Sequence, residues 1–351
     1  MPHRLHCARV LLLVFFALMA QAAHAADRTY EIGTKRMTFI DSTRSIKAAA
    51  GFAGSPHRRI DVIVWYPARR AADDAPLADG GPWPLVIYSH GTFGAPDNAL
   101  HLVRHLVSHG YVVAAPTYPL TSSAAFTKIK APEISDVVNQ PKDISFVIDR
   151  LLADRFFAPA IDKARIGTTG HSLGAVTSYF TSFGLQTRDP RIVATAPIAA
   201  GDPVQSALSS DMGLLGTGNA PVFVPTLFLS AEKDVFARTT GRPYAAYSRI
   251  EKPKYEVMVK GGVHVWFRDG NEQLPDNKNP DCLFFDKWMP GTAMPGCEER
   301  VPLIGPAKQQ EITRTAVLAF FDAYLKKDKA ALADLRGLGT RFAEVELRSE
   351  E

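Results

Sequence analysis

The residues with the clearest chemical meaning are Gly170-His171-Ser172-Leu173-Gly174, a Gly-x-Ser-x-Gly pattern. It follows a short apolar run at residues 164–169 and precedes a helical-looking run at residues 173–183. A serine in this context is typical of a nucleophile elbow, a turn so tight that small residues are needed two positions before and after it. The helix N-terminus would then face developing negative charge. The alternative is a glycine-rich turn in which Ser172 only caps the helix.

A serine hydroxyl is a weak nucleophile, so it needs a base to remove its proton and an acid to orient that base. In proteins that have such a nucleophile elbow, the order along the chain is serine, acid, histidine. Asp234 follows the penultimate predicted strand, and His264 follows the last one in a glycine-containing loop. We therefore expect Ser172, Asp234 and His264 to be catalytic. Glu232 and Asp202 are the alternative acids, and His264 is otherwise a surface-loop histidine.

The tetrahedral oxyanion needs two backbone N–H donors that are already in position. One is expected from Leu173, the residue after the nucleophile. The other is expected from the loop after the strand at residues 84–89, where Thr92 is the predicted donor and Phe93 the neighbouring candidate. His90 precedes the serine in the chain, so we expect it to support this loop rather than to act as the base.

Other side chains have plainer interpretations. His101, His105 and His109 recur every four residues and share one helix face, but no carboxylate or cysteine joins them. A solvated helix face is therefore favoured over a metal site, and no cofactor or metal is expected. Trp266 and Phe267 follow the predicted base, and they either line the substrate pocket or pack in the core.

The N-terminal residues 1–25 have the features of a signal peptide. Arg4 and Arg9 precede an apolar run at residues 10–20 that is too short to span a bilayer, and Ala23-His24-Ala25 has the form of a cleavage site. An uncleaved anchor is the alternative. Cleavage would change the formal net charge from +4 to +2. Because the chain has no basic run, nucleic acid is not an expected partner, and no other segment predicts a membrane anchor.

The expected export also bears on the cysteines. Cys282 and Cys297 would remain after cleavage, and an even pair in an exported protein predicts a disulfide. Two free thiols or a metal pair are the alternatives. The pair lies within residues 271–306, which have the character of an insertion after the predicted base. A periplasmic or secreted location is expected.

The pattern of strands and helices predicts an α/β fold. Short apolar strands are expected at residues 84–89, 111–116, 165–169, 191–197, 225–230 and 254–260, the last of the sheet, with helices between several of them. Such apolar strands favour a mostly parallel sheet with helices on both faces. Strands at residues 29–41 and 59–67 have no helix between them and predict an antiparallel N-terminal edge. Residues 26–351 are expected to form a single α/β-hydrolase domain.

Several stretches of the chain form a recognisable series: Val64-Trp-Tyr-Pro-Ala68, Tyr88-Ser-His-Gly91, Ser108-His-Gly-Tyr-Val-Val-Ala-Ala-Pro116, Pro141-Lys-Asp-Ile144 and the segment from Arg165 to Gly174. This series resembles the predicted dienelactone hydrolases of bacteria, which are similar to platelet-activating-factor acetylhydrolases within the α/β-hydrolase superfamily. The resemblance implies Ser172 as nucleophile, Asp234 as acid and His264 as base, with Leu173 and Thr92 as oxyanion donors. True dienelactone hydrolases use a cysteine nucleophile, so the resemblance does not fix the substrate.

These observations together predict an exported serine esterase. It would cleave carboxylic esters, small or polymeric, through an acyl-enzyme intermediate and without a cofactor. The same residues acting on amides, lactones or polyesters are the enzymatic alternative. A binding protein on a decayed hydrolase scaffold is the alternative from another class.

Overall fold

The computed structural model describes residues 29–49, 51–127, 129, 133–203, 223–240, 243–288, 290–291 and 294–351. The expected signal peptide, residues 1–25, lies outside the described residues. Its presence and its cleavage therefore stay predictions.

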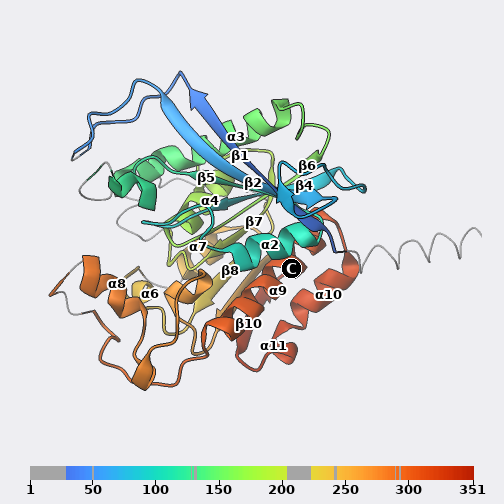
Figure 1. The fold of residues 1–351 in the computed structure, drawn as a ribbon. Coiled ribbons are helices and arrows are strands. Elements are labelled where there is room, and N and C mark those ends of the chain that lie inside the picture. Colours follow the sequence, from blue (N-terminus) through green and yellow to red (C-terminus); the bar gives the residue numbers. More distant parts are fainter. Residues whose placement is uncertain are drawn as a thin grey trace, which may run out of the picture.

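The regular elements alternate along most of the chain (Figure 1). The strands are Glu31–Asp41 (β1), Arg58–Ala68 (β2), Ala72–Asp73 (β3), Trp83–Ser89 (β4), Val112–Thr117 (β5), Ile161–His171 (β6), Ile192–Ile198 (β7), Thr226–Ala231 (β8), Lys254–Val259 (β9) and Val345–Glu350 (β10). The α-helices are Leu100–Ser108 (α2), Gln140–Ala153 (α3), Leu173–Phe183 (α4), Val235–Thr240 (α6), Tyr244–Arg249 (α7), Asp281–Trp288 (α8), Pro306–Leu325 (α9), Lys329–Arg336 (α10) and Leu338–Arg341 (α11). Short 3₁₀-helices are Ser123–Thr127 (η1), Ile134–Asn139 (η2), His264–Phe267 (η3) and Pro275–Asn277 (η4).

All of these strands join one sheet, in the order β10-β9-β8-β7-β6-β4-β5-β2-β1-β3. The strands from β5 through β4, β6, β7 and β8 to β9 are parallel to their neighbours. At one edge β2 is antiparallel to both β5 and β1. The prediction of a mostly parallel sheet with an antiparallel N-terminal edge is confirmed.

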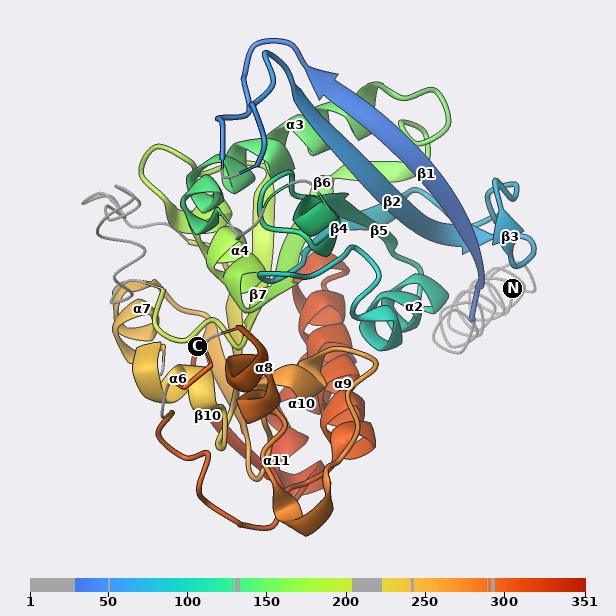
Figure 2. The ribbon, with the colours of Figure 1, turned by 60° about the vertical axis from the view of Figure 1, so that its left-hand side comes forward.

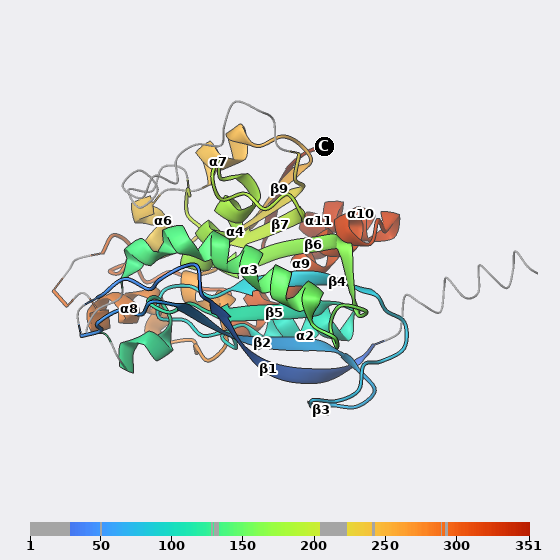
Figure 3. The ribbon, with the colours of Figure 1, turned by 90° about the horizontal axis from the view of Figure 1, so that it is seen from above.

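The inner strands are apolar because both faces of the sheet are covered. In β4 every residue is buried, as expected for a parallel strand between two helical layers. Helices α2 and α9 pack on one face and α3 and α4 on the other. Figure 3 shows α3 running across the near face of the sheet when the molecule is seen from above. Helices thus cover both faces, as predicted.

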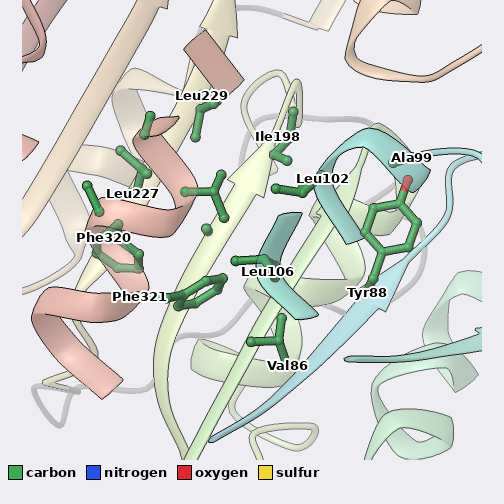
Figure 4. Packing of buried hydrophobic residues seen from close by; sticks show 14 of the residues in the cluster. Val86, Tyr88, Ala99, Leu102, Leu106, Ile198, Leu227, Leu229, Phe320 and Phe321 are labelled. Atoms are coloured by element: carbon green, nitrogen blue, oxygen red, sulfur yellow. The ribbon is translucent and has the colours of Figure 1, made fainter. Parts of the chain in front are cut away.

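One core cluster joins the parallel strands to α2 and α9 (Figure 4). Its buried side chains include Val86, Tyr88, Leu102, Leu106, Ile198, Leu227, Leu229, Phe320 and Phe321. Each fully buried side chain of this size contributes about 1.5–3 kcal/mol of hydrophobic stabilisation. This packing fixes the strands whose carboxyl ends carry the candidate site.

The expectation that the sheet ends with the strand at residues 254–260 is wrong. One further strand, β10, pairs antiparallel with β9, with Val345 opposite Val259 and Glu350 opposite Lys254. Most of β10 is exposed and polar, since an edge strand needs only one apolar face and one paired side. It therefore lacks the continuous apolar run by which the inner strands are recognised.

Candidate active site

A sharp turn forms where β6 ends and α4 begins. Ser172 occupies it with φ 58° and ψ −122°, a backbone conformation that a non-glycine residue adopts only where its surroundings enforce it. Its N–H donates to Ile198 O over 2.9 Å, and its carbonyl accepts from Ala175 N–H over 2.9 Å. Hydrogen bonds on both sides thus hold the turn, and Ser172 is half-buried rather than enclosed.

Gly170 and Gly174 let this turn press against β4. A Cβ atom on Gly170 would lie 2.6 Å from Ser89 O, and one on Gly174 would lie 2.7 Å from His90 O. Both contacts are to backbone atoms, which cannot rotate away as a side chain can. This is the collision expected from the Gly-x-Ser-x-Gly pattern, and it excludes any larger residue at either position.

The loop after β4 lies directly against the turn. A Cβ atom on Gly91 would lie 2.9 Å from Ser172 Cβ and 2.9 Å from His171 O. Gly94 N–H donates back to Gly91 O over 2.9 Å, which closes the loop into a tight turn. The loop and Ser172 are therefore in van der Waals contact, with Gly91 making the close approach possible.

Two backbone N–H groups beside Ser172 are available to a ligand. Leu173 N–H stands at the first position of α4, where a helix offers no acceptor. Thr92 N–H has no acceptor among the described residues, whereas Phe93 N–H donates to Thr121 O over 2.8 Å. Of the two candidates in the loop, Thr92 is the one whose N–H is not already used by the fold.

His90 has both ring nitrogens engaged. Nδ1 lies 2.8 Å from Gly91 O, and Nε2 accepts from Tyr118 N–H at 3.2 Å. These partners require a proton on Nδ1 and none on Nε2, so the imidazole is neutral. Burial lowers the pKa of His90 to about 4, although the hydrogen bond to Gly91 O opposes that shift. His90 thus holds the loop in place, as expected, and has no nitrogen free for Ser172.

The carboxyl ends of β8 and β9 bring an acid and an imidazole together. His264 Nδ1 lies 2.8 Å from Asp234 Oδ2. Both side chains are buried, 4% and 2% exposed respectively. Asp234 Oδ1 accepts from Ala237 N–H over 3.0 Å, so both oxygens of the carboxylate are held. An imidazole that donates from Nδ1 to a carboxylate keeps Nε2 as its proton acceptor, which is the state a general base needs.

The two alternative acids lie elsewhere. Glu232 Oε2 accepts from Gly261 N–H over 2.9 Å and its Oε1 lies 3.0 Å from Lys233 Nζ. Asp202 is buried near Tyr179, where burial first and the charge of Asp202 second raise the pKa of the phenol. Of the three carboxylates considered from the sequence, the geometry pairs Asp234 with His264.

His171 connects the turn to the imidazole loop. Its Nε2 lies 3.0 Å from His264 O and donates to it, since a carbonyl oxygen only accepts. The two imidazole rings lie 4.5 Å apart between centroids. Burial, with a contribution from the charge of His264, holds the pKa of His171 well below its usual range. The residue before Ser172 is therefore a neutral hydrogen-bond donor to the backbone of the candidate base.

Two side chains from distant segments hold the loop that carries His264. Gln309, in α9, accepts from Val263 N–H over 2.9 Å and donates to Val263 O over 2.7 Å. Asp281, the first residue of α8, accepts from His264 N–H over 3.0 Å. Neither residue could be recognised from the sequence. No motif marks them, because their partners are backbone groups 46 and 17 residues away along the chain.

A row of phenylalanine side chains extends from the candidate base to the loop after β4. Phe236 lies 4.2 Å from the His264 ring between centroids, and Phe284 lies 5.2 Å from Phe236. Phe93, in the loop after β4, lies 5.7 Å from Phe284 and 4.2 Å from Phe126. All four phenyl groups are half-buried. We call Phe93, Phe126, Phe236 and Phe284 the aromatic wall.

Trp266 and Phe267 are core residues. Trp266 is fully buried in a cluster with Val263 and Val265, and Phe267 belongs to the main core cluster. Of the two interpretations offered by the sequence, packing is the one that the structure supports. The aromatic groups nearest the base come from the wall instead.

The histidines of α2 do not gather around a metal position. His101 Nδ1 lies 3.1 Å from Asp269 Oδ1, and the His105 and His109 rings lie 4.4 Å apart. Within the described ranges, no group of three His, Cys, Asp or Glu side chains is arranged to bind a metal ion. Nor does any helix in this part of the chain have the length and hydropathy needed to cross a membrane.

The segment after the base is closed by a disulfide between Cys282 and Cys297, which are 15 residues apart. Cys282 packs with Val235 and Phe285 in a small apolar cluster. Figure 2 shows the result: α8 lies beside α6, the helix that follows Asp234.

The fold and the site can now be set beside known proteins. A family model for chlorophyllase matches residues 74–212, which include the loop after β4 and the turn at Ser172. No curated protein matches the chain. Among solved structures, a ferulic acid esterase from Streptomyces cinnamoneus is similar, with a TM-score of 0.64 and 21% identity over 91% of this chain and 97% of that one. At this identity the likeness concerns the fold.

The chain has the α/β-hydrolase fold. The fold expected from the sequence is thus confirmed, whereas the narrower likeness to dienelactone hydrolases stays a prediction. In this fold, Ser172, Asp234 and His264 follow β6, β8 and β9 respectively. That is the chain order of nucleophile, acid and base in the superfamily.

Proposed function

We propose that this α/β-hydrolase is a serine esterase that cleaves carboxylic esters with Ser172, His264 and Asp234. The observation that carries the proposal is the buried pair of Asp234 and His264, 2.8 Å apart, tied through His171 to the turn at Ser172. The match to the chlorophyllase model and the likeness to a ferulic acid esterase support ester cleavage.

In the first half of the reaction, Ser172 Oγ attacks the ester carbonyl carbon while His264 Nε2 takes the hydroxyl proton. Asp234 stabilises the imidazolium that forms. The carbonyl oxygen becomes an oxyanion that accepts hydrogen bonds from the N–H groups of Leu173 and Thr92. When the tetrahedral intermediate collapses, the carbon–oxygen bond to the alcohol breaks and His264 gives the proton to the leaving alkoxide. Ser172 is left acylated.

In the second half, water takes the place of the alcohol. His264 removes a proton from the water as it attacks the acyl carbon, and the same two N–H groups bind the oxyanion. Collapse releases the carboxylic acid, and His264 returns the proton to Ser172 Oγ. Atoms and protons balance over the cycle, and the route needs no cofactor.

The aromatic wall supports a preference for esters with a bulky apolar or aromatic group. Phe236 lies next to the base, Phe284 packs against Phe236, and Phe93 follows the proposed oxyanion donor Thr92. Half-buried phenyl groups favour substrate rings in stacked or edge-to-face contact, each pair being worth about 0.5–1.5 kcal/mol. We therefore expect esters that carry a bulky apolar or aromatic group to be better substrates than small aliphatic esters.

The disulfide supports a location in an oxidising compartment, the periplasm or the exterior. This agrees with the expected signal peptide, whose cleavage the N-terminal sequence of the purified protein would test. Cleavage after Ala25 would leave Ala26 as the first residue.

The function is tested by measuring hydrolysis of p-nitrophenyl esters, from acetate to palmitate, and of methyl ferulate by wild type and Ser172→Ala. We expect the variant to lose kcat by about 10⁴-fold or more, since the catalytic residues act as a unit. Equal rates for the two proteins on every ester would refute the esterase. Amides, lactones and polyesters would then be tried with the same pair, and inactivity on these too would favour a binding protein.

A further inference from the structure

The loops that carry the proposed acid and base follow two different strands. Asp234 follows β8 and His264 follows β9. One hydrogen bond between the two side chains fixes their separation but not the backbones from which they extend. A displacement of about 1 Å in such a group costs on the order of a hundredfold in rate. The two loops are joined ahead of these residues by hydrogen bonds from Gly261 N–H to Glu232 Oε2 and from Lys233 N–H to Gly262 O. A contact that joins them at Asp234 and His264 themselves would position the pair more closely.

A third carboxylate lies behind the pair and contacts both loops. Asp281 Oδ2 accepts from Val235 N–H over 3.1 Å and from His264 N–H over 3.0 Å. Its Oδ1 accepts from Val265 N–H over 2.9 Å. Val235 begins α6, directly after Asp234, and His264 and Val265 begin η3. One carboxylate thus satisfies the first N–H groups of two helices that would otherwise lack acceptors.

The segment around Asp281 is itself well anchored. Asn279 donates to Lys233 O over 2.7 Å, and its side-chain oxygen accepts from Asp281 N–H over 2.9 Å. The next residue, Cys282, is held by the disulfide to Cys297. Asp281 therefore contacts the acid and base loops from a part of the chain that is held on both sides, at Asn279 and at Cys282.

The charge of Asp281 is costly where it stands. The side chain is fully buried. Burial raises the pKa of Asp281 to about 6, and the charge of Asp234 also raises it, whereas His264 and the backbone N–H donors act in the opposite direction. Arg268 is a further charged group that interacts with it, and His171 lies beyond His264. A buried carboxylate close to a second one is poorly explained by stability alone.

We propose that Asp281 is a positioning residue of the esterase: it fixes the acid loop to the base loop and places a second negative charge behind the imidazolium of His264. The inference rests on the proposed function of Ser172, Asp234 and His264. Asp281 touches neither Ser172 nor the proposed oxyanion donors in any hydrogen bond of the structure's described part, so it acts through His264 and Asp234.

The test compares Asp281→Asn with wild type. The amide keeps the shape but lacks the charge, and its NH₂ group would face one of the N–H donors. We expect kcat for p-nitrophenyl acetate to fall about a hundredfold with KM unchanged, because the substrate is not contacted. The substitution removes a negative charge that favours the protonated imidazole of His264. The acidic limb of the kcat/KM profile should therefore move to lower pH.

Asp286→Asn is the matched control. Asp286 lies on the same helix and is exposed, and among the described residues its one ion-pair contact is Lys278 at 4.0 Å. We expect it to keep the wild-type kcat and pH profile. A purely structural role for Asp281 would lower folding yield or melting temperature without moving the pH profile of the folded fraction. A kcat for Asp281→Asn within about twofold of wild type, with an unmoved profile, would overturn the proposal.

Two further measurements keep the proposal testable. If Asp281→Asn does not fold, Asn279→Ala loosens the same junction without burying a new group; about a fivefold loss of kcat supports the proposal, and wild-type kcat overturns it. The downfield proton resonance of the His264–Asp234 hydrogen bond, absent in His264→Ala, should weaken in either variant and needs no substrate. Ser172→Ala, assayed in parallel, separates failure of the proposed function from failure of the inference about Asp281. If Ser172→Ala stays active, the proposed function fails. If Ser172→Ala is inactive while the variants at Asp281 and Asn279 keep wild-type activity, the inference fails.

Discussion

The nucleophile and the base of the candidate site are held in place by different means. Ser172 is positioned by its neighbours in the chain, the glycines at positions 170 and 174, and by the adjacent strand β4. His264 is positioned by side chains from far along the chain, Asp281 in α8 and Gln309 in α9. The first arrangement depends on steric exclusion, the second on a set of polar contacts. Damage to the first should be all-or-none, whereas damage to the second should be graded.

The largest effect is expected at the turn, from Gly174→Ala. The new Cβ atom would meet backbone atoms of Ser89 and His90, and neither can move without moving β4. We expect esterase activity to be lost, and the free energy of unfolding to fall by at least about 3 kcal/mol. Soluble yield, urea unfolding and p-nitrophenyl ester hydrolysis measure this.

Gly339→Ala is the control for the loss of a glycine as such. Gly339 lies in α11, and the nearest atom to a Cβ there, Val345 O, is at an ordinary contact distance of 3.6 Å. Alanine at this position should be neutral or slightly stabilising. If Gly174→Ala behaved like Gly339→Ala, steric exclusion would not be what positions Ser172.

An intermediate effect is expected on the base side, from Cys282→Ser with Cys297→Ser. The disulfide closes a short loop next to Asp281, with a sequence separation of 15. Its removal should lower the free energy of unfolding by about 3 kcal/mol. Because Asp281 keeps its three hydrogen bonds, kcat should fall only about threefold to tenfold.

Wild type treated with a phosphine reductant should match the double serine variant in both stability and kcat. A double variant as inactive as Ser172→Ala would contradict the graded behaviour of the base side. A variant with unchanged stability would show that the loop is held by its other contacts.

The smallest effect at neutral pH is expected from His90→Gln. The pKa of His90 is lowered to about 4 by burial, against an ordinary value of about 6.5. Between these values the unfolded chain binds a proton at His90 that the folded protein does not. Wild-type stability should therefore fall as the pH drops from about 6.5 to about 4.

Glutamine cannot bind that proton, so the slope of unfolding free energy against pH should decrease by about 1.4 kcal/mol per pH unit in this window. Urea unfolding at several pH values measures the slope. Above about pH 7 the pH dependence of the two proteins should coincide. Equal slopes in the acidic window would mean that His90 is protonated in the folded protein.

The same contrast explains what could be predicted from the sequence. The turn at Ser172 was found because its requirements lie within five consecutive residues, and the helix after it was predicted at residues 173–183, as observed. The inner strands were found because parallel strands buried on both faces are apolar throughout. The carboxylate and imidazole were located from their places after successive strands.

The rest could not be predicted for physical reasons. Asp281 and Gln309 bind backbone groups, so no complementary pair of side chains in the sequence indicates their role. The aromatic wall assembles Phe93, Phe236 and Phe284 from three separate segments. The edge strand β10 is mostly polar and follows two helices. Its sequence therefore resembles an irregular polar terminus and does not indicate a strand.

The contact between Gln309 and Val263 also bears on how the protein is made. These residues are 46 positions apart, and Gln309 is the later one. A nascent chain that has already exposed Ser172, Asp234 and His264 outside the ribosome still lacks Asp281 and α9. Its base loop lacks the contacts from Asp281 and Gln309 until those segments emerge. We therefore expect catalytic competence to be acquired late in synthesis, after most of the sheet has formed.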